Sequence, residues 1–227
     1  GPDWPRWRGP NGDGITTETD WNPQALSGGP KILWKTDVGW GYSSPAIVKG
    51  RVYISGQDQG KEFVTCLDAA SGRRIWRSAL EGDLPPQSSP TVDGDSVYVV
   101  SQPGAVSCLA ARDGKVLWRK DLVKEYNTEN IPHGYSGSPV VSGDLLVLNV
   151  NTAGVALKKD TGALAWTSDV HTKLKSAHGY HATPVLYDHA GKKTALFMDG
   201  TGLSAVDVET GKRLWFFPWF DPYWAPL

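Results

Sequence analysis

The stretch LDAASGRRIW, at residues 67–76, returns three more times along the chain and decides its fold. The other copies, which align with it without gaps, are LAARDGKVLW (109–118), LKKDTGALAW (157–166) and VDVETGKRLW (206–215). Every copy ends in a glycine, three further residues and a tryptophan. These pairs are Gly72 and Trp76, Gly114 and Trp118, Gly162 and Trp166, and Gly211 and Trp215. Self-similarity at a fixed period predicts a repeat architecture, in which each copy is one structural unit.

The repeats also share their beginnings, where a proline follows Ser or Thr. The four prolines, at positions 45, 90, 139 and 184, are spaced by 45, 49 and 45 residues. In the first copy, Ala46-Ile47-Val48 and Val52-Tyr53-Ile54 flank a turn at Lys49-Gly50, which is typical of a β-hairpin. A third strand at Val64–Leu67 follows, and a fourth from Arg73 to Ser78 contains Trp76. Four strands per period of about 45 residues indicate the blade of an all-β propeller. The predicted blades cover residues 43–80, 88–122, 136–170 and 181–217.

The composition agrees with a globular β-protein. The 227 residues include 26 Gly, 16 Pro and 11 Trp but one Met, and 40% are hydrophobic. A net charge of −1 without runs of like charge gives no support to a nucleic-acid partner. No apolar run reaches the ~20 residues that span a bilayer. Because the chain starts at Gly1-Pro2, we expect a mature form after signal removal or a tag-cleavage remnant.

The repeat unit resembles the tryptophan-docking motif of PQQ-type propellers, on the LDAASGRRIW pattern and its copies. This family includes the quinoprotein alcohol dehydrogenases and the non-enzymatic outer-membrane assembly lipoprotein BamB. The opening DWPRWRGPNGDGIT (3–16) is similar to the start of bacterial, often planctomycete, PQQ-binding-like repeat proteins. The acidic position of the motif is kept at Asp68 and Asp207 but is Ala110 and Lys158 in the middle copies. The resemblance implies a propeller fold and a periplasmic or otherwise extracytoplasmic location.

The repeated tryptophans have a structural role under this interpretation. We expect each indole to pack against the glycine turn of a neighbouring blade, which makes cofactor stacking the lesser alternative. The predicted anchors are Trp34, Trp76, Trp118, Trp166 and Trp215, with the turn glycines Gly72, Gly114, Gly162 and Gly211.

Four repeats are fewer than the seven or eight blades usual in the family. Residues 1–30 are expected to form an N-terminal extension, 31–218 the propeller repeats with an outer strand at 31–36, and 219–227 an aromatic tail. Three arrangements are open: a half or fragment of a larger ring, two copies that form an eight-bladed ring as a homodimer, or a small closed ring of four blades.

The resemblance also raises quinone chemistry. In the dehydrogenases, PQQ lies on the propeller axis with Ca²⁺, held by Glu, Asn and Asp oxygens, an Arg and a Trp floor. The sequence has no dense group of carboxylates typical of a calcium site, and no catalytic residue is predicted. Cys66 and Cys108 fall at equivalent positions of neighbouring repeats, too far apart for a disulfide, and are expected to be buried free thiols. We therefore expect no cofactor, with PQQ and calcium as the alternative.

Candidate ligand-binding residues lie just before the Ser/Thr-Pro beginnings. HGY occurs at 133–135 and 178–180, and WGY at 40–42, in connections expected to meet the central funnel. Long loops on a rigid scaffold often carry binding sites. The predicted residues are Trp40, Tyr42, His133, Tyr135, His178, Tyr180 and His181. The favoured interpretation of the HGY segments is structural, with Tyr filling space between blades and His capping backbone groups, and ligand binding is the alternative. The spacing of His133, His178 and His181 does not favour a zinc or copper site.

The sequence thus predicts a non-catalytic, extracytoplasmic binding or scaffolding propeller that contacts a protein, peptide or glycan through the funnel face. The alternative is a PQQ-dependent oxidoreductase or a fragment of one.

Overall fold

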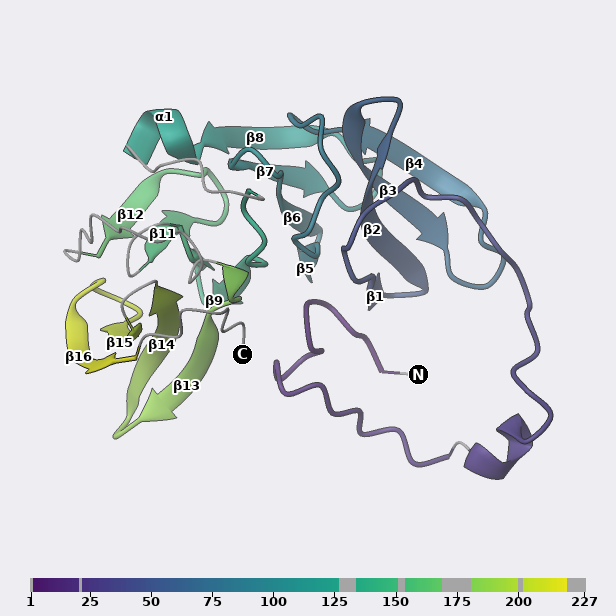
Figure 1. Cartoon of the computed structure of the whole chain (residues 1–227), viewed down its shortest axis with the longest axis horizontal. Coiled ribbons are helices and arrows are strands. Elements are labelled where there is room, and N and C mark those ends of the chain that lie inside the picture. The colour runs from purple at the N-terminus through teal and green to yellow at the C-terminus, as the bar shows by residue number, and fades with distance from the viewer. Residues whose placement is uncertain are drawn as a thin grey trace.

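The computed structural model arranges the repeats as four antiparallel sheets along an arc (Figure 1). It describes residues 2–20, 22–126, 134–150, 154–168, 181–199 and 202–219. Within these ranges each repeat forms one four-stranded sheet, and the strand order follows the chain. The all-β propeller with four blades that the sequence predicts is confirmed.

The bounds of the strands match the predicted repeats. Blade 1 contains β1 (Ala46–Val48), β2 (Arg51–Asp58), β3 (Lys61–Asp68) and β4 (Arg74–Ala79). Blade 2 contains β5 (Thr91–Asp93), β6 (Ser96–Val100), β7 (Ala105–Ala110) and β8 (Val116–Asp121). Blade 3 contains β9 (Val140–Ser142), β10 (Leu145–Leu148), β11 (Val155–Lys158) and β12 (Leu164–Thr167). Blade 4 contains β13 (Val185–His189), β14 (Lys192–Asp199), β15 (Gly202–Asp207) and β16 (Arg213–Pro218). The described helices are η1 (Pro23–Leu26) and α1 (Leu122–Tyr126).

The first strand of each blade faces the concave side of the arc, which we call the funnel, and the last strand lies at the outer rim (Figure 1). The tight turns follow from local chemistry. Lys49 and Gly50, between β1 and β2, both have positive φ, 49° and 72°. After β3, Asp68 Oδ1 accepts hydrogen bonds from Ser71 N (2.9 Å) and Ser71 Oγ (2.6 Å), which closes the turn before β4. The corresponding Asp207 accepts from Glu209 N and Thr210 N, so both acidic positions act as the motif predicts.

The apolar core fills the spaces between successive blades. Tyr53, Val64 and Cys66 of blade 1 belong to one buried cluster with Val97 and Leu109 of blade 2. Because each blade buries side chains on both faces, its strands contain near-continuous apolar runs. Cys66 and Cys108 are both buried and free, as expected. Burial raises the pKa of the Cys66 thiol to about 11, so the group stays protonated at neutral pH.

Each docked tryptophan lies over the glycine turn of the next blade. Trp76 Nε1 donates to Ala111 O at 3.0 Å, Trp118 Nε1 to Lys159 O at 2.9 Å, and Trp166 Nε1 to Val208 O at 2.8 Å. A Cβ added at the turn glycine would lie 2.6 Å from Trp76 or 2.7 Å from Trp118 and Trp166. These three indoles thus make the contacts between neighbouring blades that an anchoring role requires.

The two ends of the arc differ from each other: a docked tryptophan is found at the first blade but not at the last one among the described residues. Trp34 docks on blade 1 in the same way, since its Nε1 donates to Ala69 O at 3.0 Å and Thr36 Oγ1 donates to Gly72 O at 2.7 Å. Trp215 is 40% exposed and has no such docking bond in the described residues. The anchoring role of Trp215 therefore stays a prediction. A small closed ring would require Trp215 on the Gly72 turn, where Trp34 lies instead.

The predicted outer strand at 31–36 is also corrected. The segment is extended but forms no strand, and Ile32 and Leu33 are 64% and 77% exposed. The physical reason is that β1–β4 already complete blade 1. The segment therefore docks on that blade through Trp34, and it pairs with no strand in the described part of the chain.

A row of hydroxyl groups joins the inner ends of the blades. The residue before each repeat proline donates its backbone N–H to the hydroxyl at the same position of the next blade. These bonds are Ser44 N to Ser89 Oγ (2.9 Å), Ser89 N to Ser138 Oγ (2.9 Å) and Ser138 N to Thr183 Oγ1 (3.0 Å). The Ser/Thr-Pro beginnings therefore hold neighbouring blades in register around the funnel.

Residues 3–14, which we call the N-terminal strap, lie in the funnel (Figure 1). Trp4 pairs antiparallel with Ile47 of β1 through bonds of 2.7 and 2.8 Å, and Pro5 O accepts from Val92 N of β5 at 2.8 Å. Asp3 Oδ1 also accepts from Lys49 N at 2.9 Å. The strap thus forms an isolated β-bridge at the inner edge of blade 1, which satisfies backbone groups that this edge would otherwise expose.

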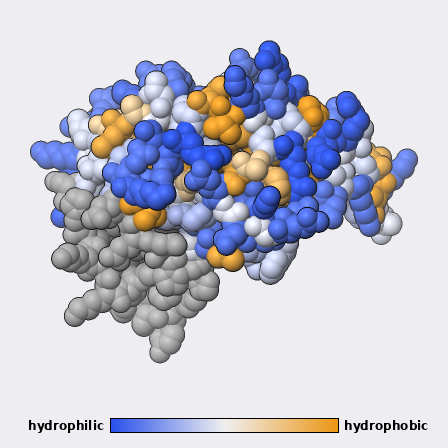
Figure 2. All heavy atoms as spheres, turned by 90° about the horizontal axis from the view of Figure 1, so that it is seen from above, coloured by the Kyte–Doolittle hydropathy of each residue, from blue (hydrophilic) through white to orange (hydrophobic). Residues whose placement is uncertain are grey.

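The surface seen from above the arc is largely hydrophilic, with small separate apolar patches (Figure 2). Among the described residues, no helix has both the length and the apolar composition needed to cross a membrane.

We predict that Gly114→Ala destabilises the protein more than Gly50→Ala. Both glycines have left-handed φ, 74° and 72°, so each alanine should cost about 1–2 kcal/mol of unfolding free energy in backbone strain. The new Cβ at 114 would also lie 2.6 Å from Trp76, whereas nothing lies within 4 Å at Gly50. Overpacking should add a further ~1–3 kcal/mol at 114. Urea unfolding of both variants measures the difference, and equal losses would contradict indole docking as the source.

Candidate functional site

One face of the arc carries the connections between blades, and we call it the loop face. Its described connections are 38–45, 80–90, 134–139 and 181–184, each of which leads into the first strand of a blade. The predicted ligand-binding residues fall on these connections. A rigid sheet behind each connection fixes where its side chains project.

Trp40 and Tyr42 project from the first connection. Their exposed fractions are 64% and 66%, and their ring centroids lie 6.4 Å apart with planes inclined by 52°. The backbone beneath them is held firmly: Trp40 exchanges two hydrogen bonds with Gln57 (2.8 and 2.7 Å), and Tyr42 N donates to Pro86 O (2.8 Å). Two large aromatic side chains are thus presented to solvent from a fixed backbone.

A polar row crosses the inner ends of blades 2 to 4. Ser136 Oγ donates to Gln87 Oε1 at 2.7 Å and lies 2.8 Å from His181 Nδ1. Gln87, Ser136 and His181 each stand three residues before a repeat proline, as Tyr42 does. The prediction for His181 did not include Gln87 or Ser136. Aligning the residues three before each proline would have found both.

The remaining predicted residues form two groups, one that is buried and one that lies outside the described residues. Tyr135 is only 1% exposed, its N–H donates to Gln102 O at 3.0 Å, and its ring packs on Gly104. The prediction that Tyr135 contacts a ligand is therefore wrong, because the ring fills space in the buried cluster between blades 2 and 3. His133, His178 and Tyr180 lie outside the described residues.

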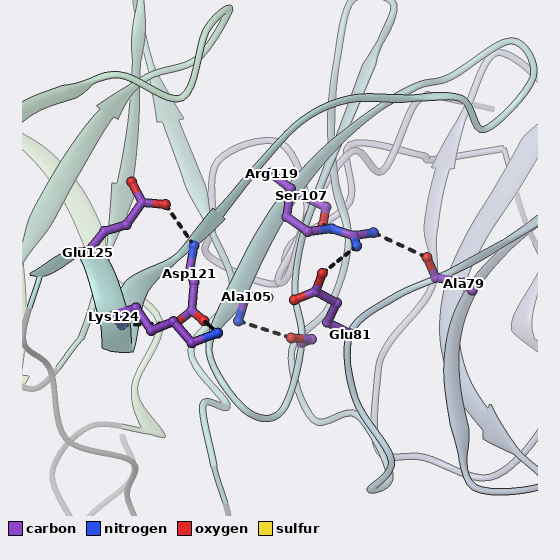
Figure 3. Close-up of polar contacts among 9 residues, drawn as sticks. Ala79, Glu81, Ala105, Ser107, Arg119, Asp121, Lys124 and Glu125 are labelled. Carbon is purple, nitrogen blue, oxygen red and sulfur yellow. Dashed lines mark hydrogen bonds and ion pairs between the residues drawn. The ribbon is translucent and has the colours of Figure 1, made fainter.

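A cleft of about 460 Å³ opens between blades 1 and 2 at the loop-face ends of their strands. Its lining residues are Glu81, Gly82, Asp83, Pro103, Ala105, Asp121 and Lys124. Arg119 ties the two blades beside it (Figure 3): its Nη1 lies 2.8 Å from Glu81 Oε1, and its Nε donates to Ser107 Oγ at 3.1 Å. Lys124 pairs with Asp121 at 3.0 Å, so part of the acidic charge is neutralised within the cleft.

Glu62 lies buried beneath this cleft with no exposed surface. Its Oε2 accepts from Gln102 N at 3.1 Å, Gly82 packs directly on its carboxyl group, and Oε1 has no hydrogen-bond partner in the described residues. Burial raises the pKa of Glu62 from its ordinary value of 4.5 to about 8, and the Gln102 bond only partly opposes this. At neutral pH the carboxyl group is therefore mostly protonated, and it joins blades 1 and 2 as a neutral group.

A known protein family matches the repeats described above. The family described as "Outer membrane protein assembly factor BamB" matches residues 60–217, which include β3 and β4 of blade 1, blades 2 and 3, and blade 4 up to Phe217. The chain belongs to this BamB family. The match covers the repeats that carry the docked tryptophans.

Individual relatives include both non-enzymatic and enzymatic proteins. "Outer membrane protein assembly factor BamB" of Yersinia pestis is 29% identical over 202 residues, which covers 82% of this chain and 47% of that protein. "Quinohemoprotein alcohol dehydrogenase ADH IIB" of Pseudomonas putida is 30% identical over 136 residues, or 55% of this chain and 19% of that protein. The crystal structure of quinohemoprotein alcohol dehydrogenase from Comamonas testosteroni superposes with a TM-score of 0.74 at 16% identity, over 96% of this chain and 41% of that one. At 16% identity, the similarity to the Comamonas testosteroni structure shows a shared fold alone.

The chain thus spans about half the length of the BamB relative. The sequence match to the BamB relative covers more of this chain than the match to the dehydrogenase, 82% against 55%, at nearly the same identity.

The described axial residues do not fit PQQ with calcium. The hydroxyl groups of Ser89, Ser138 and Thr183 accept backbone bonds between blades, and the strap backbone pairs along β1. Calcium requires a set of convergent oxygen ligands, most of them carboxylates. No group of three or more His, Cys, Asp or Glu side chains converges in the part of the chain that the structure describes. We therefore derive no chemistry through a quinone.

We predict that Glu62→Gln removes a pH dependence of stability. Because the pKa of Glu62 is higher in the folded state, the folded protein holds a proton that the unfolded chain releases between about pH 4.5 and 8. The unfolding free energy of the wild type should fall across this window, by at most ~1.4 kcal/mol per pH unit, and level off above it. Gln keeps an acceptor for Gln102 N without the charge. Urea unfolding at several pH values should show a flatter profile for Glu62→Gln, and an unchanged slope would contradict a buried neutral carboxyl.

Proposed function

We propose that this protein is a non-catalytic scaffold of the periplasm that binds a protein partner through the loop face of blades 1 and 2. Membership of the BamB family supports this assignment, because the relatives are named as assembly factors for outer membrane proteins. The partner is then a component of outer membrane protein assembly.

The observation that carries the proposal is the exposed aromatic pair Trp40 and Tyr42 on its fixed backbone. Buried aromatic side chains dominate the energies of protein interfaces, and they lose little conformational entropy on binding. Leu84, 49% exposed, comes from the connection that also holds Pro86 under Tyr42. The acidic cleft lined by Glu81 and Asp83 continues along the same connection, and it favours a partner segment with a basic residue beside an apolar one.

A protein or peptide fits this surface better than a glycan. The two ring planes are inclined by 52°, so they do not form one flat platform for a sugar ring, whereas an apolar side chain can insert between them.

We favour a different protein over a second copy of the chain as the partner. A homodimer that completes an eight-bladed ring would place Trp215 of one copy on the Gly72 turn of the other. Trp34 already bonds to Ala69 O beside that turn, so the segment 31–36 would have to leave.

We predict that Trp40→Ala with Tyr42→Ala abolishes partner binding without unfolding the protein. The full chain is immobilised and exposed to a solubilised outer-membrane fraction of the bacterium that carries it, and bound proteins are identified by mass spectrometry. The wild type should retain a component of outer membrane protein assembly, and the double variant should lose it at an unchanged melting temperature.

Leu117→Ala is the matched control, because Leu117 is 53% exposed on the outer strand β8, away from the loop face. It should bind as the wild type does. Retention of the same proteins by the double variant would refute the loop-face assignment. Reduction of a dye with alcohol substrates after addition of PQQ and Ca²⁺ would refute the non-catalytic one.

A further inference from the structure

The N-terminal strap carries a feature that the proposed function does not use. After pairing with β1, the strap turns back on itself through three backbone bonds: Gly9 N to Arg6 O (3.0 Å), Gly12 N to Gly9 O (3.1 Å) and Gly14 N to Arg8 O (2.8 Å). It therefore forms a compact loop within the funnel, and its side chains are held in fixed places.

Two guanidinium groups lie on this loop, and neither has a carboxylate partner within 4 Å among the described residues. Arg6 Nη2 donates to Pro10 O at 3.0 Å, and Arg8 Nη2 donates to Asp13 O at 3.3 Å. A guanidinium has five N–H donors, so these single bonds fix each group and leave donors for a ligand. The strap thus presents two positioned cations.

Arg6 is partly buried, which disfavours the charged form of its guanidinium group. Desolvation lowers the pKa of Arg6, while the charge of Asp13 acts in the opposite direction. A cation removed from water without a close anion gains more from a bound anion than a fully hydrated one does.

Arg8 has a left-handed backbone, with φ of 61°. This conformation is unfavourable for a residue with a side chain and natural for glycine. The strained backbone places the Arg8 guanidinium on the same side of the strap as Arg6, since both line one cleft.

That cleft lies between the strap and the start of blade 4. Arg6, Arg8 and Asn11 line it from the strap, and Thr183 and Leu186 line it from blade 4. Its volume of about 40 Å³ leaves room for a small group such as a carboxylate or phosphate. Arginine is the side chain best suited to bind such a group through paired, parallel N–H donors.

We propose that this cleft is an oxyanion-binding site, in which Arg6 and Arg8 bind a carboxylate or phosphate group of a ligand that enters the funnel. Asn11 adds an amide donor at the rim. The site requires both the strap and blade 4, so it exists only when the strap is seated on β1.

Isothermal titration calorimetry on the full chain at low ionic strength tests the proposal. The probes are an end-blocked tetraglutamate peptide, the matching tetraglutamine peptide and inorganic phosphate. The wild type should bind tetraglutamate, phosphate or both, but not tetraglutamine, and comparison of the two anions shows which oxyanion is preferred. Added salt should weaken the binding.

Arg8→Gly and Arg6→Gln should each weaken anion binding about tenfold or more, by loss of charged hydrogen bonds. Arg8→Gly relieves the left-handed strain, so it should melt at or above the wild-type temperature, which separates loss of a ligand contact from unfolding. Arg74→Gln, which removes an exposed arginine on β4, should bind as the wild type does.

Three results would overturn the site. They are no binding of either anion at millimolar concentration, equal binding of tetraglutamine, and wild-type affinity in Arg8→Gly.

Discussion

The structure depends on one repeated contact, in which a tryptophan at the outer end of one blade lies flat on the glycine turn of the next. The contact needs three features at once: an indole with an N–H donor, a carbonyl in the neighbouring turn, and a turn residue without a Cβ. Burial of an indole removes ~150–250 Å² from water, which corresponds to roughly 4–6 kcal/mol before the entropy of ordering is subtracted. Trp76, Trp118 and Trp166 all meet these conditions.

This contact has a direction, and the direction explains both ends of the arc. Each blade offers a tryptophan to the next blade and receives one from the previous one. Blade 1 receives Trp34 from the segment that precedes it, whereas Trp215 of blade 4 offers an indole that no described residue receives. The hydroxyl row at the inner strands follows the same direction, from Ser44 through Ser89 and Ser138 to Thr183. Docking at the rim and hydrogen bonding at the funnel together fix the angle between neighbouring blades.

Because these contacts hold the blades in place, the connections between blades are available for function. Trp40 and Tyr42 are exposed because their backbone is secured by Gln57 and Pro86, so the side chains are not needed to stabilise the loop. Glu62, in contrast, is buried where blades 1 and 2 meet, and it joins these blades as a neutral carboxyl group. The strap closes the inner edge of β1 and brings two arginines to blade 4. The chain belongs to the BamB family, and these surfaces are the ones on which the proposed binding role rests.

The sequence by itself determined the blades, because glycine turns, β-branched runs and docking tryptophans are local signals that recur with one period. It also marked the exposed pair Trp40 and Tyr42 and the two free thiols. Only the tertiary structure decided that Tyr135 is buried, that Gln87 and Ser136 join His181, that Glu62 is deprived of water, and that the strap lies in the funnel beside blade 4. Burial and pairing of such residues depend on groups about 20 to 180 positions away in the chain. A periodic pattern specifies what each segment becomes, but the partners of its non-repeated side chains are set when the blades pack together.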